Sequence, residues 1–239
     1  MQYKKGPFLF ILFLIATCLS AQEKEKSYDI TPHAIWYPHS YKAYHVQTAL
    51  GFSMVKPPMV WVYTSLTAPV INFHMTFGLP KNFAIVADVS TIVVSNQITL
   101  GPNWNFIHKN FSFNLGYNVG FLIGQMKVKE YDNRATAVLL YPNVSVGYRL
   151  KQVAFTLRGE LCSVAYSHVT SGDAAIDHSG RFFNGGSYAL YIEQRLWKDH
   201  VMVFGLKDNI NKLYWPVWLL FTTYNRYYQI PELYFSFVI

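Results

Sequence analysis

The sequence contains little charge. Asp, Glu, Lys and Arg make up 14% of its residues, whereas 51% are hydrophobic and 18% are aromatic. A soluble domain typically carries about 25% charged residues. The formal net charge is +7, and Lys4 and Lys5 supply two of these charges. The remaining excess is spread along the chain, so it indicates contact with lipid headgroups at most and argues against nucleic acid as a partner.

Cysteine is also scarce. The chain has two cysteines, Cys18 near the N-terminus and Cys162 much later. A single thiol after residue 21 excludes an internal disulfide framework in that part. Long apolar runs are missing too, because no segment after residue 21 approaches the roughly 18 apolar residues that indicate a membrane-spanning helix. We therefore expect neither cross-links nor membrane helices to hold this part of the chain.

The first 21 residues have the order of a secretory signal peptide. Two lysines precede a short apolar run at residues 8–16, and small residues then lead to Ala21. This order is typical of a cleaved signal. We expect cleavage after Ala21, which leaves residues 22–239 as one domain. The alternative is a lipoprotein that uses Cys18 as the lipid acceptor.

Residues 111–124 alternate in character with a period of two. The odd positions are apolar, from Phe111 to Ile123, and the even positions are mostly Ser, Asn and Gly. Such alternation indicates a β-strand with one apolar face. The strand is longer than the usual length of about five or six residues in soluble sheets. It meets the length of about 9–11 residues that a tilted transmembrane strand needs.

The same pattern recurs and predicts ten strands in total. They span residues 44–55, 69–78, 83–94, 97–106, 111–124, 136–150, 153–166, 187–197, 201–210 and 229–239. The count would be eight if one of the hairpins, whose alternation is weak, does not form. Twelve would result if residues 215–221, Trp-Pro-Val-Trp-Leu-Leu-Phe, supply an extra pair.

The predicted connections alternate in length. Short polar connections lie at 78–82, 107–110, 150–152 and 198–200, and longer ones lie at about 56–68, 124–135, 167–186 and 211–228, with a short exception near residue 95. Outer-membrane barrels have tight periplasmic turns and longer extracellular loops. An even number of strands would then place both ends of the barrel chain on the periplasmic side.

Aromatic residues gather at both ends of the predicted strands. Beside the short turns they are Phe77, Phe83, Phe106, Phe111 and Tyr148, and at the opposite ends they are Trp61, Tyr63, Trp215, Trp218, Tyr227 and Tyr228. Aromatic girdles of this kind lie at the two lipid–water boundaries of a membrane barrel.

The final strand ends in Leu-Tyr-Phe-Ser-Phe-Val-Ile, with apolar and aromatic residues alternating to the last position. In this strand and in the pattern of residues 22–239, the chain resembles the small outer-membrane β-barrel proteins of Gram-negative bacteria, a class that usually ends on Phe. The resemblance implies an all-β, antiparallel, transmembrane up-and-down barrel of about ten strands in the outer membrane. Its partners would be outer-membrane lipid and lipopolysaccharide, and the barrel-assembly machinery during biogenesis. The oligomeric state stays open.

A soluble exported barrel or sandwich would show the same alternation with its apolar faces inside. The less apolar faces of this chain carry many Gly, Ser and Asn residues and few Lys or Glu residues. That composition suits a lumen better than a surface in water. We therefore expect the apolar faces to point outward.

Five charged residues fall on the predicted inward faces of three consecutive strands: Arg149, Arg158, Glu160, Glu193 and Arg195. Charges in a lumen of low dielectric constant need partners, so we expect an ion-pair network that fills the barrel. The alternative is a selectivity ring or a substrate site. At ten strands the interior is narrow, which argues against an open diffusion pore.

A candidate ligand surface lies in the connection at 167–186, where it comprises His168, Ser171, Asp173 and His178. Loops of this kind often carry binding residues. A Ser–His pair is also what a membrane-embedded lipid hydrolase would use, although the strand pattern points His168 inward, away from lipid. No spacing matches a metal site or a nucleotide motif, so we expect no cofactor.

Three functions remain from the sequence. We favour a non-enzymatic barrel that stabilises the envelope or presents loops for interaction. The alternatives are a narrow channel or transporter for small or apolar solutes, and an outer-membrane lipid hydrolase.

Overall fold

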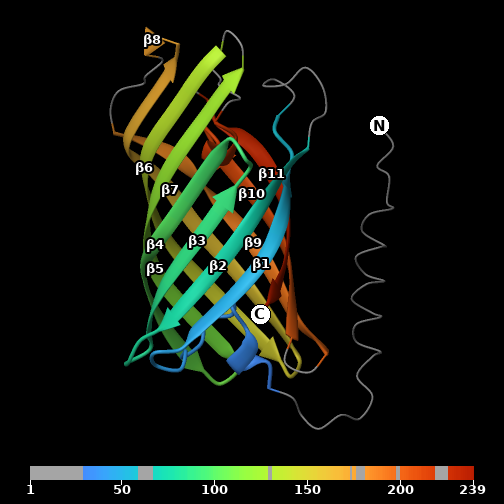
Figure 1. The fold of residues 1–239 in the computed structure, drawn as a ribbon. Helices are drawn as coiled ribbons and strands as arrows, with labels where there is room; N and C mark the ends of the chain where they lie inside the picture. The colour runs from blue at the N-terminus through green and yellow to red at the C-terminus, as the bar shows by residue number, and fades with distance from the viewer. Residues whose placement is uncertain are drawn as a thin grey trace, which may run out of the picture.

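Ten antiparallel strands close into a barrel (Figure 1). The computed structural model describes residues 29–58, 67–128, 131–172, 174–175, 181–197, 200–218 and 226–239. The ring consists of β1 (Val46–Val55), β2 (Ala68–Gly78), β3 (Phe83–Thr91), β4 (Ser95–His108), β5 (Phe111–Val128), β6 (Tyr131–Leu150), β7 (Val153–Ser171), β9 (Phe182–Trp197), β10 (His200–Asn211) and β11 (Tyr228–Val238). The predicted count of ten is confirmed.

Closure of the ring comes from two pairings. β1 pairs with β11, the last strand, and β7 pairs with both β6 and β9. Every strand of the ring therefore has two neighbours. The short strand β8 (Ala174–Ala175) pairs only with the end of β7 and stands outside the ring. A closed ring lets strands hydrogen-bond all round, which is the requirement for backbone in hydrocarbon.

The connections give the barrel two different ends. At one, here called the turn end, residues 79–82, 109–110 and 151–152 join β2–β3, β4–β5 and β6–β7. Residues with positive φ occur in each of these turns, namely Lys81, Asn82, Lys109 and Lys151, as tight hairpins require. The C-terminus and the segment that precedes β1 also lie at this end (Figure 1). The opposite end is called the loop end.

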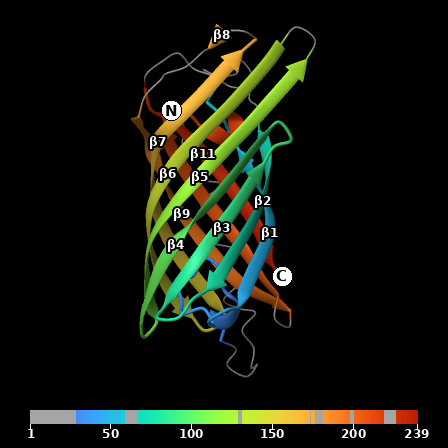
Figure 2. The ribbon, with the colours of Figure 1, turned by 60° about the vertical axis from the view of Figure 1, so that its left-hand side comes forward.

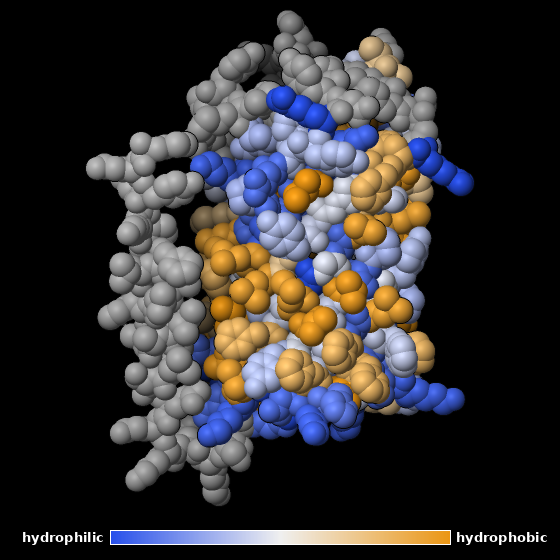
Figure 3. Space-filling model, turned by 180° about the vertical axis from the view of Figure 1, so that it is seen from behind, coloured by the Kyte–Doolittle hydropathy of each residue, from blue (hydrophilic) through white to orange (hydrophobic). Residues whose placement is uncertain are grey.

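The two faces of the strands differ as the sequence predicts. In β5, Ser112, Asn114 and Asn118 are buried in the lumen, whereas Phe113 and Leu115 are exposed on the outside. Figure 3 shows the result on one face of the molecule, where apolar side chains form a band across the barrel wall above a hydrophilic lower rim. The apolar faces therefore point outward, opposite to the arrangement of a soluble barrel.

Aromatic side chains beside the turns contribute to this band. Phe83, Phe106, Phe111 and Tyr148 are all exposed near the turn end, as predicted for the girdle there. Trp61 and Tyr63 of the other predicted girdle lie outside the described residues.

Three adjacent strands are the longest of the barrel, followed by β9 with 16 residues. β5, β6 and β7 contain 18, 20 and 19 residues, and Figures 1 and 2 show that they rise beyond the rest of the barrel at the loop end. The prediction of a long loop at 124–135 is wrong, because β5 and β6 stay paired from Gly124–Ala135 to Val128–Tyr131. In the extension of β5 the exposed positions are polar, Gln125 and Lys127, so the apolar outer face that marks a membrane strand ends at Ile123.

The helical elements in the described residues are two short 3-10 turns, η1 (Thr31–His33) and η2 (Trp215–Val217). Within the same residues no helix has the length and apolar character needed to cross a membrane.

The close approach of β4 and β5 depends on Gly101. A Cβ atom at this position would lie 2.1 Å from the carbonyl oxygen of Tyr117, whereas a Cβ at Gly159 would meet only Val144 Cγ1 at 3.8 Å. We predict that Gly101→Ala destabilises the barrel by about 1–3 kcal/mol, the usual cost of overpacking. Gly159→Ala is the matched control and should change the free energy of unfolding little. Urea unfolding in lipid vesicles measures both, and equal stabilities would contradict the account.

Candidate functional site

The segment before β1 enters the lumen at the turn end. Ile30, Ala34, Ile35 and Tyr37 are buried there in one cluster, and residues 29–39 are called the turn-end plug below. The barrel wall faces the plug with small residues, listed here as Ala49, Ala154 and Ala189. Gly147 also makes room, since a Cβ on it would lie 2.6 Å from Tyr37 Cδ2. The plug is thus fitted to this part of the lumen.

Glu193 anchors the turn-end plug from β9. Its Oε1 accepts hydrogen bonds from the backbone N–H groups of Ile35 at 2.7 Å and Trp36 at 3.1 Å, and its Oε2 accepts one from Tyr37 at 2.6 Å. The carboxyl group is completely buried, at 0% exposure. Three charge-assisted hydrogen bonds offset the cost of removing a carboxylate from water. The expectation of an ionic partner for Glu193 is wrong, because backbone amides take that place.

Arg149 holds the start of the same plug. Its Nη1 lies 2.6 Å from Asp29 Oδ1, and it also donates to the Thr31 hydroxyl. Partial burial raises the pKa of the Asp29 carboxyl, but hydrogen bonds from Thr31 and the nearby Arg149 charge lower it more, so the net pKa lies below its usual value. The partner of Arg149 is therefore the plug and not the other charges of the predicted network.

His39 is the last residue of the turn-end plug, and its side chain is neutral. It is buried, and its Nδ1 lies 3.0 Å from the carbonyl oxygen of Tyr37. Burial lowers the pKa of His39 to about 4, because removal from water disfavours the charged form. The ring therefore adds no positive charge to the interior at neutral pH.

Arg158 and Glu160 do form an ion pair, with Nη2 and Oε2 3.0 Å apart. The two residues are neighbours on the lumen face of β7, so of the five predicted charges these two meet. Arg158 also lies over the Trp36 ring, 5.6 Å from its centroid. Arg195 lies near the turn end of β9, where its backbone N–H donates to Gln152. The described contacts of Arg149, Arg158 and Glu193 are local and do not join these three side chains to one another.

Trp36 is the innermost residue of the turn-end plug. Its ring stacks on Tyr191 at a centroid distance of 4.2 Å and lies 4.5 Å from the His74 ring. Tyr234 meets it edge-on at 5.7 Å. The plug thus ends in an aromatic cluster near the middle of the lumen.

A second segment fills the lumen from the loop end. Trp215, Val217 and Trp218 are buried, Trp218 at 3% exposure, and residues 213–218 are called the loop-end plug. Asn184 anchors it by two hydrogen bonds with the backbone of Leu213, at 2.9 and 3.0 Å. A Cβ on Gly124 would lie 2.0 Å from Trp218 Nε1, so the indole packs against bare backbone. The assignment of Trp215, Trp218 and the buried Tyr228 to an outer girdle is wrong.

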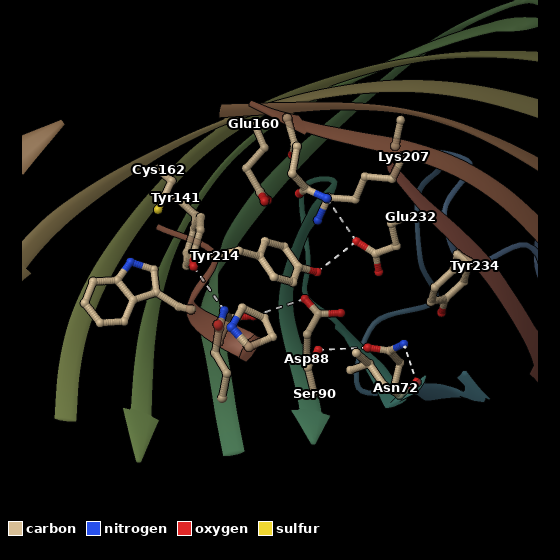
Figure 4. Close-up of a pocket in the computed structure, with 18 of the residues that line it drawn as sticks. Asn72, Asp88, Ser90, Tyr141, Glu160, Cys162, Lys207, Tyr214, Glu232 and Tyr234 are labelled. Atoms are coloured by element: carbon tan, nitrogen blue, oxygen red, sulfur yellow. Dashed lines mark hydrogen bonds between the residues drawn. The ribbon is translucent and has the colours of Figure 1, made fainter. Parts of the chain in front are cut away.

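Between the two plugs lies a polar cavity of about 130 Å³, called the chamber. Figure 4 shows its polar walls, where Ser90 donates to Asn72 at 2.8 Å and Tyr214 donates to Glu232 at 3.1 Å. Asp88 pairs with His74 on the same wall. Small-molecule sites usually enclose about 300–1,000 Å³. The chamber is therefore suited to a few water molecules and not to an open passage.

The predicted ligand surface is only partly described. Asp173 and His178 lie outside the described residues, and Ser171 pairs with Asn133 at the end of β7. His168 is exposed on the outer face, so the prediction that it points inward is wrong. Val138 lies opposite Tyr166 and Leu139 opposite Val164, which leaves one extra residue in β7. Such a bulge reverses the side-chain alternation beyond it.

Neither the turn-end plug nor the loop-end plug is predicted from the sequence. The signal for the turn-end plug is an apolar stretch, Ile35-Trp-Tyr37, directly before the first strand. In the described residues no group of three or more His, Cys, Asp or Glu side chains is placed to hold a metal ion.

The closed ring of ten antiparallel strands, its apolar exterior and its polar, filled lumen define a small β-barrel of the outer-membrane type. No protein-family model matches the sequence, and no curated protein matches it. Among solved structures, the translocator domain of the autotransporter NalP from Neisseria meningitidis is similar at a TM-score of 0.42 and 8% sequence identity, over 97% of this chain and 95% of that one. The class assignment depends on the topology and exterior of this chain.

Replacement of the plug anchor should loosen the turn-end plug. In Glu193→Gln the amide retains the shape of the side chain but loses the charge and one acceptor. We predict that the plug is weakened by about 1.5–3 kcal/mol, the worth of a hydrogen bond to a charged group. An added protease should then cleave within residues 29–39 faster than in the wild type. Glu232→Gln, which removes the same charge from the other side of the chamber, should leave that rate unchanged. Equal rates for all three proteins would refute the anchoring role.

Proposed function

We propose that this protein is an integral outer-membrane barrel whose lumen is filled by its own chain, and that it serves the envelope without enzymatic activity. Its role would be structural or would depend on contacts made at the loop end. The observation that carries the proposal is the pair of plugs on either side of a chamber of about 130 Å³. A diffusion pore needs a continuous aqueous path, and both plugs lie across it.

The orientation in the membrane follows from the two ends. In outer-membrane barrels the tight turns face the periplasm and the longer segments face outward. The turn end and its plug would then be periplasmic, and the extension of β5, β6 and β7 would reach into the medium. The apolar band would lie in outer-membrane lipid and lipopolysaccharide, and the barrel-assembly machinery would insert it.

A narrow conduit is the second candidate, and the polar lining of the chamber favours it. Asp88, Glu160 and Glu232 face this space together with Arg158 and Lys207. A solute would reach these groups only if a plug moved. On this view the plugs are gates, and the resting protein is the closed state.

Conductance across a planar bilayer separates the two candidates. We predict no steady current through the wild-type barrel. A variant that combines Trp215→Ala, Trp218→Ala and Glu193→Gln should conduct, since the indoles fill the loop end and Glu193 holds the turn-end plug. Heat-modifiable migration on a gel checks that each protein has folded. Discrete single-channel openings of the wild type would favour the gated conduit, and a steady ohmic current would contradict the filled lumen altogether.

A further inference from the structure

The outer surface of the barrel carries an apolar groove over strands β5, β6, β7, β9 and β10. The groove has a volume of about 610 Å³. Its walls are side chains that are between 42% and 63% exposed: Leu115, Val144, Leu161, Phe183, Tyr188 and Ile210. Such a hollow is unlike a smooth lipid-facing surface, because it can hold a chain in one position.

Two glycines form the floor of this groove. Gly159 lies opposite Val144 on one side and opposite Tyr188 on the other, and Gly186 lies opposite Leu161 and Ile210. Outward positions of this kind carry bulky side chains elsewhere on the barrel, so a missing side chain leaves a depression. The space above Gly159 is open, since a Cβ there meets only Val144 Cγ1 at 3.8 Å. At Gly186 a Cβ would lie 2.7 Å from the carbonyl oxygen of Glu160, so strand packing requires that glycine, whereas at Gly159 the depression is a gap in the side-chain layer.

A polar cluster borders the groove on the outside of the barrel. Tyr188 donates to Asp208 Oδ2 at 2.7 Å, and Gln229 donates to the same oxygen at 2.6 Å. Asp208 is only 9% exposed. It lies three positions before the end of β10, and Gln229 is the second residue of β11. A carboxylate is costly on a lipid face and less so near the interface, so this cluster marks the headgroup level at the loop end.

A cationic side chain stands beside the same end of the groove. Lys212 Nζ lies over the ring of Tyr227, 5.4 Å from its centroid, and Tyr227 itself lines the groove. Arg226 instead lies over Tyr228 at 4.9 Å, and that ring is buried with Val217 on the lumen side, so Arg226 stands at the mouth of the lumen and not on the groove. Basic groups held at the membrane surface attract anionic headgroups. The combination of an apolar groove, a hydrogen-bonding cluster and a cationic rim is complementary to a lipid with an anionic, hydroxyl-rich head.

We infer that this groove is a specific lipid site, which holds an acyl chain of a lipopolysaccharide-type glycolipid of the outer leaflet. Lys212 faces a phosphate of its head, and the Tyr188–Asp208–Gln229 cluster faces its sugar hydroxyl groups. A glycolipid fits better than a phospholipid, because its head presents phosphates and several hydroxyl donors together. The inference rests on the proposed outer-membrane location, and it adds a defined ligand and a defined position to it.

The test uses the full-length protein in detergent, with purified lipopolysaccharide and phosphatidylglycerol as separate probes. Gly159→Phe fills the groove, and Lys212→Gln removes a rim charge outside the strands. Leu50→Phe, at a half-exposed position on β1, is the control for an added exterior aromatic ring. Binding of lipopolysaccharide should weaken about tenfold in each groove variant, the effect of losing roughly one good contact. The control should bind as the wild type does.

Each other result overturns the inference. Unchanged binding by both groove variants would exclude the groove as the site, and Lys212→Gln decides this even if Gly159→Phe fails to fold. Equal or tighter binding of phosphatidylglycerol would exclude the glycolipid as the preferred occupant. Recovery in outer-membrane fractions and heat-modifiable migration are measured in parallel. A barrel that passes these two checks but binds no lipopolysaccharide leaves the proposed function intact and refutes only the lipid site.

Discussion

The requirement that every backbone amide in hydrocarbon has a partner determines this structure. Helices meet it locally, but this chain meets it by closing a sheet, through the pairings of β1 with β11 and of β6 with β7. Closure fixes which face of each strand meets lipid, so the alternation of residues becomes an apolar outside and a polar inside. The position of each side chain relative to the membrane follows from this one constraint.

Closure also creates the interior that must be filled. Eight strands leave a lumen that side chains alone can occupy, and the ring of ten here holds two segments of its own chain as well. The two plugs use different chemistry. At the turn end the buried Glu193 carboxylate binds the backbone N–H groups of Ile35, Trp36 and Tyr37. At the loop end Trp215 and Trp218 pack among apolar side chains such as Leu122 and Leu139. The chamber remains between them, because neither plug spans the full height of the barrel.

The sequence predicts most of the fold because the membrane imposes a period of two on every strand within it. The prediction fails in segments that lie outside the membrane-spanning part of the strands. In the extension of β5 past Gly124 the outward positions are polar, Gln125 and Lys127, so the apolar face by which the strands are predicted ends there. A single extra residue in β7 moves His168 to the opposite face of the strand. The amino-acid sequence gives no sign of this bulge. The site is predicted less well: the Arg158–Glu160 pair follows from their spacing, but the partners of Glu193 are backbone amides, which have no residue signature. Aromatic residues occur both in membrane girdles and in packed interiors, so the sequence pattern predicts an outer girdle position for Trp218, whereas the structure buries this residue in the lumen.

The central claim is that the segment before β1 lies inside the barrel in the membrane-embedded protein. Amide hydrogen exchange of the wild type, measured by NMR in lipid nanodiscs, tests it most directly. The N–H groups of Ile35, Trp36 and Tyr37 should exchange as slowly as those of the neighbouring strands. Exchange at the rate of an unstructured tail would contradict the account.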